Sequence, residues 1–327
     1  MNPTEVPPNG LQLVPGLWFE DGNVIIQAET DHFRIYRGVL AARSPIFNDM
    51  LGLPQPQELE TLEGCPVVRL PDAALEVAAF LRALFDSAFF EPYPSPSEFH
   101  IIAGILRLSH KYDVAYLRHR ALVHLSSLYS TTLDEWDLQL TSWPASTSMF
   151  AIELAREVGA EWILPVAFYN LAAAAHNLGM KEIIAGTAFG SFHVKLGAQD
   201  LAHFLEGYLL QRDNETSTML RFLHSPVPVI GCTGGSKCTL ARLIAVTQFQ
   251  ADRVEYPAIP LDIWGQTDWT RLSAACSTCL KALKYTHAAA RESFWDKLPG
   301  LYGLLEWDEL RKMKTQGLKN DPEPRSW

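Results

Sequence analysis

Four cysteines near the end of the chain have the residue type and the spacing to bind a metal. Cys232 and Cys238 are the first and last residues of the segment CTGGSKC, and Cys276 and Cys279 form a C-x-x-C pair. Four thiolates bind zinc tetrahedrally, and each pair of neighbouring cysteines can supply one edge of the tetrahedron. The C-x-x-C spacing is conventional, whereas the five residues between Cys232 and Cys238 exceed the usual two to four. The sequence therefore predicts one structural zinc ion that joins the two segments.

Two other interpretations of these cysteines stay open. Isolated cysteines often behave as small apolar core residues, and Cys276 and Cys279 would then face inward at positions i and i+3 of a helix. A C-x-x-C pair can also act as a redox dithiol. His224 and His287 could each replace a thiol as a metal ligand, and Cys65 is expected in a loop without a partner.

The chain shows no motif of an established catalytic or nucleotide-binding site. Gly231 to Thr239 has the composition of a phosphate-binding loop, but Ser236 separates Gly235 from the lysine, so the spacing of that motif is not met. The patterns G-x-S-x-G and H-E-x-x-H are absent, and no G-x-G-x-x-G follows a predicted strand. The ten histidines are scattered along the sequence. We therefore expect a protein that is not an enzyme.

The elements that must position these residues begin with a predicted β-hairpin. Val24 to Ile26 is a short apolar run suited to a buried strand, and Phe33 and Ile35 alternate with polar residues in a second strand. Ser44 and Pro45 suit the N-cap and the first position of a helix, because proline at that position gives up no hydrogen bond. The predicted order is strand, strand, short helix and capped helix.

Further along the chain the hydrophobic period becomes helical. Residues 67–70 predict a third strand, and apolar residues from Val77 to Phe85 recur at helical spacing. Ser97 is the expected N-cap of the next helix. Beyond Leu133 every convincing pattern is helical, including a helix that Asp200 would cap.

Two motifs in the first 130 residues resemble those of BTB/POZ domains. The first is a DG turn, a hairpin and F-x-x-H-[KR]-x-x-L-A-x-x-S, and its matching residues are Asp21, Gly22, Phe33, Arg37, Leu40, Ala41, Ser44, Phe47 and Met50. Tyr36 stands where the family usually has histidine, and its ring can fill the same space while keeping a polar tip. The second motif, LSHKYDV from Leu108 to Val114, resembles L-[AS]-x-[KR]-Y-[DQ]-[VI]. The resemblance implies a BTB/POZ fold over residues 16–130.

The remainder of the chain resembles a large group of fungal BTB proteins. The segment AREVGAEWILPVAFYNLA is similar to their helical extension through its core, Leu164 to Tyr169. Their comparable cysteine arrangement is followed by W-[DE]-x-L-P-x-x-[FY]-G-L-x-x-W-x-E-L, matched here by Trp295, Asp296, Leu298, Pro299, Tyr302, Gly303, Leu304, Trp307, Glu309 and Leu310. This resemblance favours zinc among the interpretations of the four cysteines.

Together these patterns predict an α+β chain, with a small β-sheet edged by α-helices followed by an all-α C-terminal half. A chain of 327 residues with 48% hydrophobic residues can bury the cores of two or three domains. The expected divisions are a flexible tail over residues 1–15, a BTB/POZ domain over 16–130, a helical BACK-like extension over 131–225 and a cysteine-bearing helical C-terminal region over 226–327.

Composition and charge limit the partners and the location. The formal net charge of −10 disfavours nucleic acid and anionic membranes, because both attract positive surfaces. The N-terminus has neither the basic nor the apolar region of a secretory signal, and the uncharged stretch from Leu164 to Met180 is interrupted by polar residues. We expect an intracellular protein, cytoplasmic or nuclear, in which thiols or metal thiolates are favoured over disulfides.

The family resemblance implies a function in protein–protein interaction, as an adaptor or scaffold. BTB domains as a family form homodimers, and many bind cullin-3 to present substrates for ubiquitylation, so a second copy and cullin-3 are the implied partners. The alternative is a transcription-associated regulator that uses the C-terminal cysteine region. Nucleic-acid contact is disfavoured by the acidic total and by the lack of a finger-like helix with interleaved basic and aromatic residues.

Overall fold

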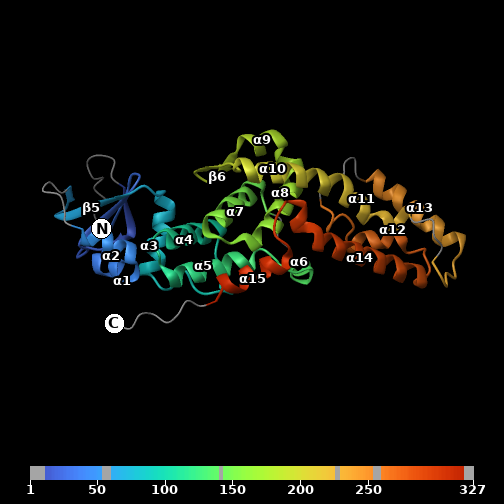
Figure 1. Cartoon of the computed structure of the whole chain (residues 1–327), viewed down its shortest axis with the longest axis horizontal. Coiled ribbons are helices and arrows are strands. Elements are labelled where there is room, and N and C mark those ends of the chain that lie inside the picture. The colour runs from blue at the N-terminus through green and yellow to red at the C-terminus, as the bar shows by residue number, and fades with distance from the viewer. Residues whose placement is uncertain (1–11, 54–59, 140–142, 225–228, 253–258, 320–327) are drawn as a thin grey trace, which may run out of the picture. The chain divides into compact units, whose positions relative to one another are not determined.

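The computed structural model describes residues 12–53, 60–139, 143–224, 229–252 and 259–319 (Figure 1). These residues form two compact units. The N-terminal unit ends at Leu128 and also takes in the described residues from Thr315 onward, and the helical unit runs from Tyr129 to Lys314.

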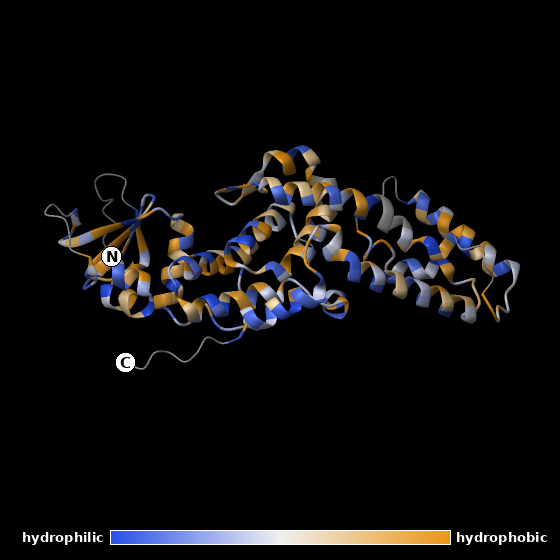
Figure 2. Cartoon of the chain, viewed as in Figure 1, coloured by the Kyte–Doolittle hydropathy of each residue, from blue (hydrophilic) through white to orange (hydrophobic). Residues whose placement is uncertain are grey.

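The N-terminal unit contains a sheet that is five-stranded within the described residues, with the order β1-β3-β2-β5-β4. Its strands are β1 (Gln12–Trp18), β2 (Val24–Ala28), β3 (Asp31–Ile35), β4 (Thr61–Leu62) and β5 (Cys65–Leu70). Strand β2 pairs antiparallel with β3, as the hairpin prediction required, and parallel with β5. Val24, Ile25 and Ile26 are fully buried, because this central strand is covered on both faces. Figure 2 accordingly shows the strands of the sheet largely in the hydrophobic colour.

The hairpin leads into helices α1 (Arg37–Arg43) and α2 (Pro45–Gly52), in the predicted order. The side chain of Ser44 caps α2, because its Oγ accepts a hydrogen bond of 3.0 Å from the backbone N–H of Phe47. The same hydroxyl donates to the backbone oxygen of Tyr112 at 2.5 Å. The predicted cap is therefore confirmed, and it also joins two segments far apart in the sequence.

Three longer helices complete the N-terminal unit, namely α3 (Ala74–Phe85), α4 (Phe99–Lys111) and α5 (Ala115–Ser127). Helix α4 packs against both α3 and α5. The prediction that Ser97 caps α4 is wrong, because the helix begins at Phe99 and its N-cap is Glu98, whose side chain makes no capping bond.

Two expectations at the edges of the sheet are also corrected. Strand β1 begins at Gln12, so residues 12–15 of the predicted tail belong to the sheet through parallel pairing with β3. Residues 1–11 of that tail lie outside the described residues. Cys65 opens strand β5 instead of lying in a loop, and its thiol donates to the backbone oxygen of Gly22 at 3.2 Å.

The helical unit is built from short helices and a few long ones. In order they are α6 (Leu133–Leu138), α7 (Ala145–Val158), η1 (Glu161–Ile163), α8 (Leu164–Leu178), α9 (Met180–Ala185), α10 (Ala198–Leu209), η2 (Leu210–Glu215), α11 (Thr216–Met219), α12 (Arg221–His224), α13 (Ser236–Ala251), η3 (Gln266–Leu272), α14 (Ser277–Leu301) and α15 (Trp307–Gly317), the last of which ends in the other unit. None of the helices in the described part of the chain combines the length and the hydrophobicity needed to span a bilayer.

The prediction of an all-α C-terminal half is wrong in one place. Strands β6 (Thr187–Phe189) and β7 (Phe192–Val194) form an antiparallel hairpin within the helical unit. Strands of three residues are too short to show an alternating pattern, and this pair is held by side-chain packing. The ring of Phe189 stacks on Phe150 of α7 at 4.7 Å between centroids, and Phe192 lies 5.8 Å from the same ring.

The predicted ends of the helices in this unit are partly confirmed. Helix α8 opens at Leu164 with proline in its first turn and ends at Gly179, as expected. Asp200 does not cap α10, because the helix begins at Ala198 after Gly197. Asp200 instead lies in the first turn and forms an ion pair of 2.8 Å with Arg156 of α7.

Candidate metal centre

The four cysteines predicted as zinc ligands come together in the helical unit. The Sγ atoms of Cys232, Cys238, Cys276 and Cys279 all lie within 4.8 Å of one another. Two of them, on Cys232 and Cys276, are 4.0 Å apart. Zinc–sulfur bonds of about 2.3 Å at tetrahedral angles place neighbouring sulfurs about 3.8 Å apart. The spacing of the cluster is therefore compatible with one tetrahedral ion bound by four thiolates.

Two helix N-termini carry three of the four thiols. Cys238 lies in the first turn of α13, Cys276 is the N-cap of α14, and Cys279 lies in the first turn of α14. The positive end of a helix dipole stabilises a thiolate, which is the form that binds metal. Cys232 comes from the segment that leads into α13. An ion bound to all four would thus join the beginnings of α13 and α14.

Backbone amides also surround the sulfurs. The N–H of Cys276 donates to Sγ of Cys238 at 3.2 Å. Hydrogen bonds from the backbone N–H groups of Cys279 and Thr233 lower the pKa of Cys276 to about 5. The pKa of Cys232 is also lowered, first by a hydrogen bond from the Cys279 thiol and then by the N–H of Gly234. Amide donors to a ligand atom are the usual support around a metal site.

The same cluster contains one thiol that resists ionisation. Cys279 is buried, and burial raises its pKa well above the ordinary value. Four adjacent thiolates would repel one another, and a divalent cation is the group that lets all four ionise together. All four are free thiols, and the 4.0 Å between Cys232 and Cys276 is twice the length of a disulfide bond. Cys238 and Cys279 are buried, as core packing would require, whereas Cys232 and Cys276 are only half-buried.

Two glycines explain the unusually long spacing between Cys232 and Cys238. A Cβ atom on Gly234 would lie 2.4 Å from the Cys238 sulfur and 3.6 Å from the Cβ of Cys276. Gly235 has φ of +52°, a conformation that other residues rarely adopt. The segment therefore folds back closely over the sulfurs, which a larger residue would prevent. The two glycines are therefore a sequence signal for a metal-binding loop, which the spacing of the cysteines alone indicated only weakly.

Neither histidine proposed as a substitute ligand belongs to the cluster. His224 ends α12 and is exposed. His287 of α14 is buried between aromatic rings, 5.3 Å from Phe222 and 5.6 Å from Trp269 between ring centroids. Burial lowers the pKa of His287 to about 4, with a smaller effect from the charge of Arg291. The imidazole is therefore neutral in the folded protein.

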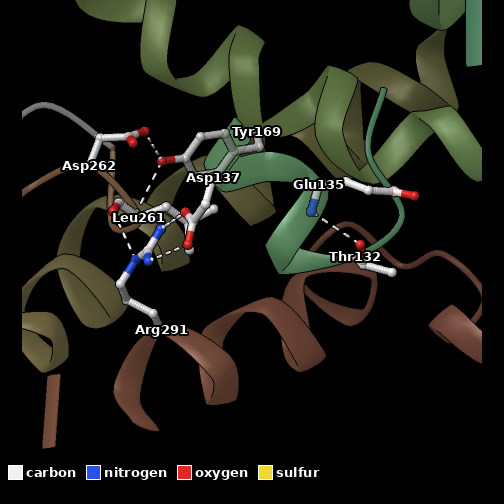
Figure 3. A network of polar contacts seen from close by, with 7 residues as sticks. All are labelled: Thr132, Glu135, Asp137, Tyr169, Leu261, Asp262 and Arg291. Carbon is white, nitrogen blue, oxygen red and sulfur yellow. Dashed lines mark hydrogen bonds and ion pairs between the residues drawn. The ribbon is translucent and has the colours of Figure 1, made fainter. Parts of the chain in front are cut away.

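A second polar constellation in the helical unit was not predicted (Figure 3). Arg291 of α14 donates to both carboxylate oxygens of Asp137 at the end of α6, and to the backbone oxygen of Leu261 at 3.2 Å. The hydroxyl of Tyr169, on α8, donates to Asp262 at 3.0 Å and accepts from the N–H of Leu261 at 3.2 Å. These residues are up to 154 positions apart, so no local pattern could reveal them.

The network has the character of a structural clasp. Tyr169 is almost completely buried, and burial followed by the neighbouring Asp262 raises its pKa far above the ordinary value, so its hydroxyl stays a donor. Arg291 and Asp137 form a two-pronged ion pair, which fixes orientation as well as distance. The clasp joins α6, α8, α14 and the segment before η3. At the start of α6, the side chain of Thr132 accepts from the N–H of Glu135 at 3.2 Å.

One cavity of about 660 Å³ lies between the end of α13 and η3. It is lined by Gln248, Ala251, Asp252, Thr267, Thr270 and Arg271. Arg271 is already paired with Asp252 at 2.7 Å and with Asp268 at 3.2 Å. Its charge is therefore balanced by the protein's own carboxylates.

Comparisons with models of known protein families, with curated proteins and with solved structures found no match.

Proposed function

We propose that this chain is a protein-interaction protein, an adaptor or scaffold, whose C-terminal region is held together by one structural zinc ion. The observation that carries the zinc is the convergence of four Sγ atoms within 4.8 Å at the N-termini of α13 and α14. A closed site with four protein ligands leaves no coordination position for a substrate, so such a zinc is structural. Its binding energy contributes directly to folding.

Elemental analysis of the purified full chain tests the zinc. We expect close to one zinc per chain, lost in Cys279→Ser and kept in Cys65→Ser. The fifth cysteine is the matched control, because Cys65 is also buried but donates to Gly22 in the other unit. Zinc-free protein that melts at the same temperature with and without chelator would contradict the proposal. Disulfides formed among the four cysteines in zinc-free protein would favour the redox dithiol instead.

The interaction function is supported by how the two BTB-like motifs lie in the N-terminal unit. Phe33 of β3, Leu40 of α1 and Phe47 of α2, all in the first motif, are fully buried. Phe47 stacks on Tyr112 of the second motif at 4.5 Å between ring centroids. Ser44 donates to the backbone of the same Tyr112 at 2.5 Å. Several of the residues that carry the resemblance are therefore among those that pack the unit together, whereas others, such as Asp21 and Arg37, are exposed.

A BTB/POZ-like unit would act by presenting surface to other proteins, in the family as a homodimer or as a cullin-3 adaptor. Light scattering on the purified chain tests the homodimer. Affinity purification of the tagged full chain tests the partner class. Recovery of cullin-3 supports the adaptor function. Recovery of chromatin components would support the transcription-associated alternative and count against the adaptor function.

A further inference from the structure

The four thiols of the cysteine cluster differ in how far they face solvent. Cys238 and Cys279 are buried, at 4% and 5% exposed, whereas Cys232 and Cys276 are only half-buried. The loop covers Cys238 closely, because a Cβ atom on Gly234 would lie 2.4 Å from its sulfur. A small oxidant in solution therefore meets Cys232 and Cys276 before it meets the other two thiols.

The two half-buried thiols also lie next to each other. Their Sγ atoms are 4.0 Å apart, although the residues are 44 positions apart in the sequence. A disulfide bond is about 2.05 Å long, so the two sulfurs must approach by about 2 Å to form one. Cys232 lies outside any helix and follows Gly231, whose φ is +79°. Backbone of this kind can move without the unwinding of a helix.

The other two sulfurs are held more firmly. Cys238 lies in the first turn of α13 and Cys279 in the first turn of α14, and both side chains are buried. The Cys238 sulfur also accepts the N–H of Cys276 at 3.2 Å. A disulfide within either cysteine pair would have to include one of these buried sulfurs. The pairing that the geometry favours is therefore Cys232 with Cys276.

We propose that Cys232 and Cys276 are a redox switch on the zinc site, in which hydrogen peroxide joins them in a disulfide and the site releases its zinc. This inference rests on the structural zinc proposed above and names a regulation of that same site. It differs from a redox dithiol in a zinc-free protein, because the starting state is the zinc-bound chain.

The reaction balances as a two-electron oxidation. One of the two thiolates attacks a peroxide oxygen, the O–O bond breaks, and with one proton the products are a sulfenic acid and water. The second thiolate attacks the sulfenic sulfur, and the S–S bond forms as the hydroxyl leaves with another proton as water. Two thiolates are thereby oxidised and one peroxide is reduced to two waters.

Loss of these two ligands opens the metal site. Only Cys238 and Cys279 remain to bind zinc, and a structural site needs four ligands. Zinc therefore dissociates, and protons replace it on the two remaining thiolates. The new disulfide joins the same two segments that the ion joined. A thiol reductant reverses the disulfide, after which the four cysteines can bind zinc again.

Zinc release and disulfide mapping on the purified, reduced full chain test the switch. Zinc content is measured first, and a chain without zinc would contradict the proposed zinc site and the switch together. Hydrogen peroxide should then transfer the zinc to a chromogenic chelator. Peptide mapping without reductant should find Cys232 joined to Cys276, and thiol reductant with added zinc should restore the starting zinc content.

The variant Cys232→His separates metal binding from disulfide formation. Three thiolates and one imidazole are a common set of zinc ligands, so this variant should keep its zinc, but it cannot form the disulfide. Peroxide should release zinc from it at least about tenfold more slowly than from the wild type. Cys65→Ser is the matched control, because Cys65 is a buried cysteine of the other unit, and its zinc release should equal that of the wild type.

Several outcomes would overturn the switch. Zinc that stays bound in peroxide removes it and leaves the structural zinc standing. Zinc release with a disulfide inside the C-x-x-C pair or between Cys232 and Cys238, or with sulfinic acids and no disulfide, also removes it. Equally fast release from Cys232→His and the wild type has the same consequence. If Cys232→His binds no zinc, the disulfide mapped in the wild type decides.

Discussion

The N-terminal unit and the region around the cysteine cluster are stabilised in different ways. In the N-terminal unit, Val24, Ile26 and Phe33 are fully buried, and the sheet and its helices share one apolar core. In the cysteine region, α13 buries a narrow stripe and leaves Leu240 and Leu243 more than half exposed. A helix that buries only a narrow apolar stripe gains little from that burial, and a metal cross-link at its start can add stability. The cysteines therefore lie at the start of a helix that the described residues cover on one face only.

Loss of the metal should destabilise the cysteine region and leave the N-terminal unit unchanged. Cys279→Ser, or removal of zinc by chelator, should destabilise α13 and the start of α14 by several kcal/mol, because structural zinc contributes its binding energy to folding. Hydrogen exchange measures this region by region. We expect faster exchange in α13 and unchanged protection in β2. Equal loss of protection in both would contradict separate stabilisation of the two regions.

A substitution in the apolar core should destabilise the N-terminal unit instead. Phe47 is fully buried between Phe80 and Tyr112, at 6.4 and 4.5 Å between ring centroids. Phe47→Ala should lower the free energy of unfolding of this unit by about 3–5 kcal/mol, because it leaves a cavity. Denaturant titration measures the loss. Zinc content should stay unchanged, and loss of zinc in this variant would show that the units do not fold independently.

One pH effect should come from His287 of the helical unit. Burial holds the pKa of His287 at about 4, below the value near 6.5 of the unfolded chain, so protonation favours unfolding. The contribution of neutral His287 to the free energy of unfolding is therefore fully present above about pH 6.5. It falls by about 3 kcal/mol in total as the pH drops towards 4. His287→Phe keeps a ring beside Phe222 and Trp269 but does not titrate.

The quantity to measure for His287 is the difference in unfolding free energy between wild type and His287→Phe from pH 7 to pH 4. Acid also protonates zinc-binding thiolates, but it does so in both proteins, so the difference isolates the imidazole. The variant should become relatively more stable as the pH falls. A difference that stays constant over this range would contradict a neutral, buried His287.

The smallest effect concerns the loop glycine. Gly234→Ala places a Cβ 2.4 Å from the Cys238 sulfur, so the loop must shift. We expect zinc affinity to fall about 10- to 100-fold, as when a group that supports metal ligands is disturbed. Competition with a chromogenic chelator measures the affinity. Gly38→Ala in α1, where a Cβ meets nothing within 4 Å, is the control, and equal affinities in the two variants would contradict the close approach.

Much of the N-terminal unit could be predicted because its signals are local. The hairpin and the Ser44 cap follow from residue types within a few positions of each other, and so does the helix of the helical unit that begins at Leu164. Two N-caps predicted from residue type alone were wrong. Helix α4 begins two residues after Ser97, and α10 begins two residues before Asp200. The hairpin of β6 and β7 was missed because its stability comes from packing on Phe150 and not from an alternating pattern.

Residue type alone identified the candidate metal ligands, which are two pairs of cysteines with glycines between the first two. That the two pairs meet follows from the packing of α13 and α14, because Cys238 and Cys276 are 38 positions apart and no local pattern places them. The same holds for Arg291 and Asp137, 154 positions apart. Residue type and short spacing set the chemistry that each segment can offer. The packing of the helices determines which of these side chains come close enough to bond to one another.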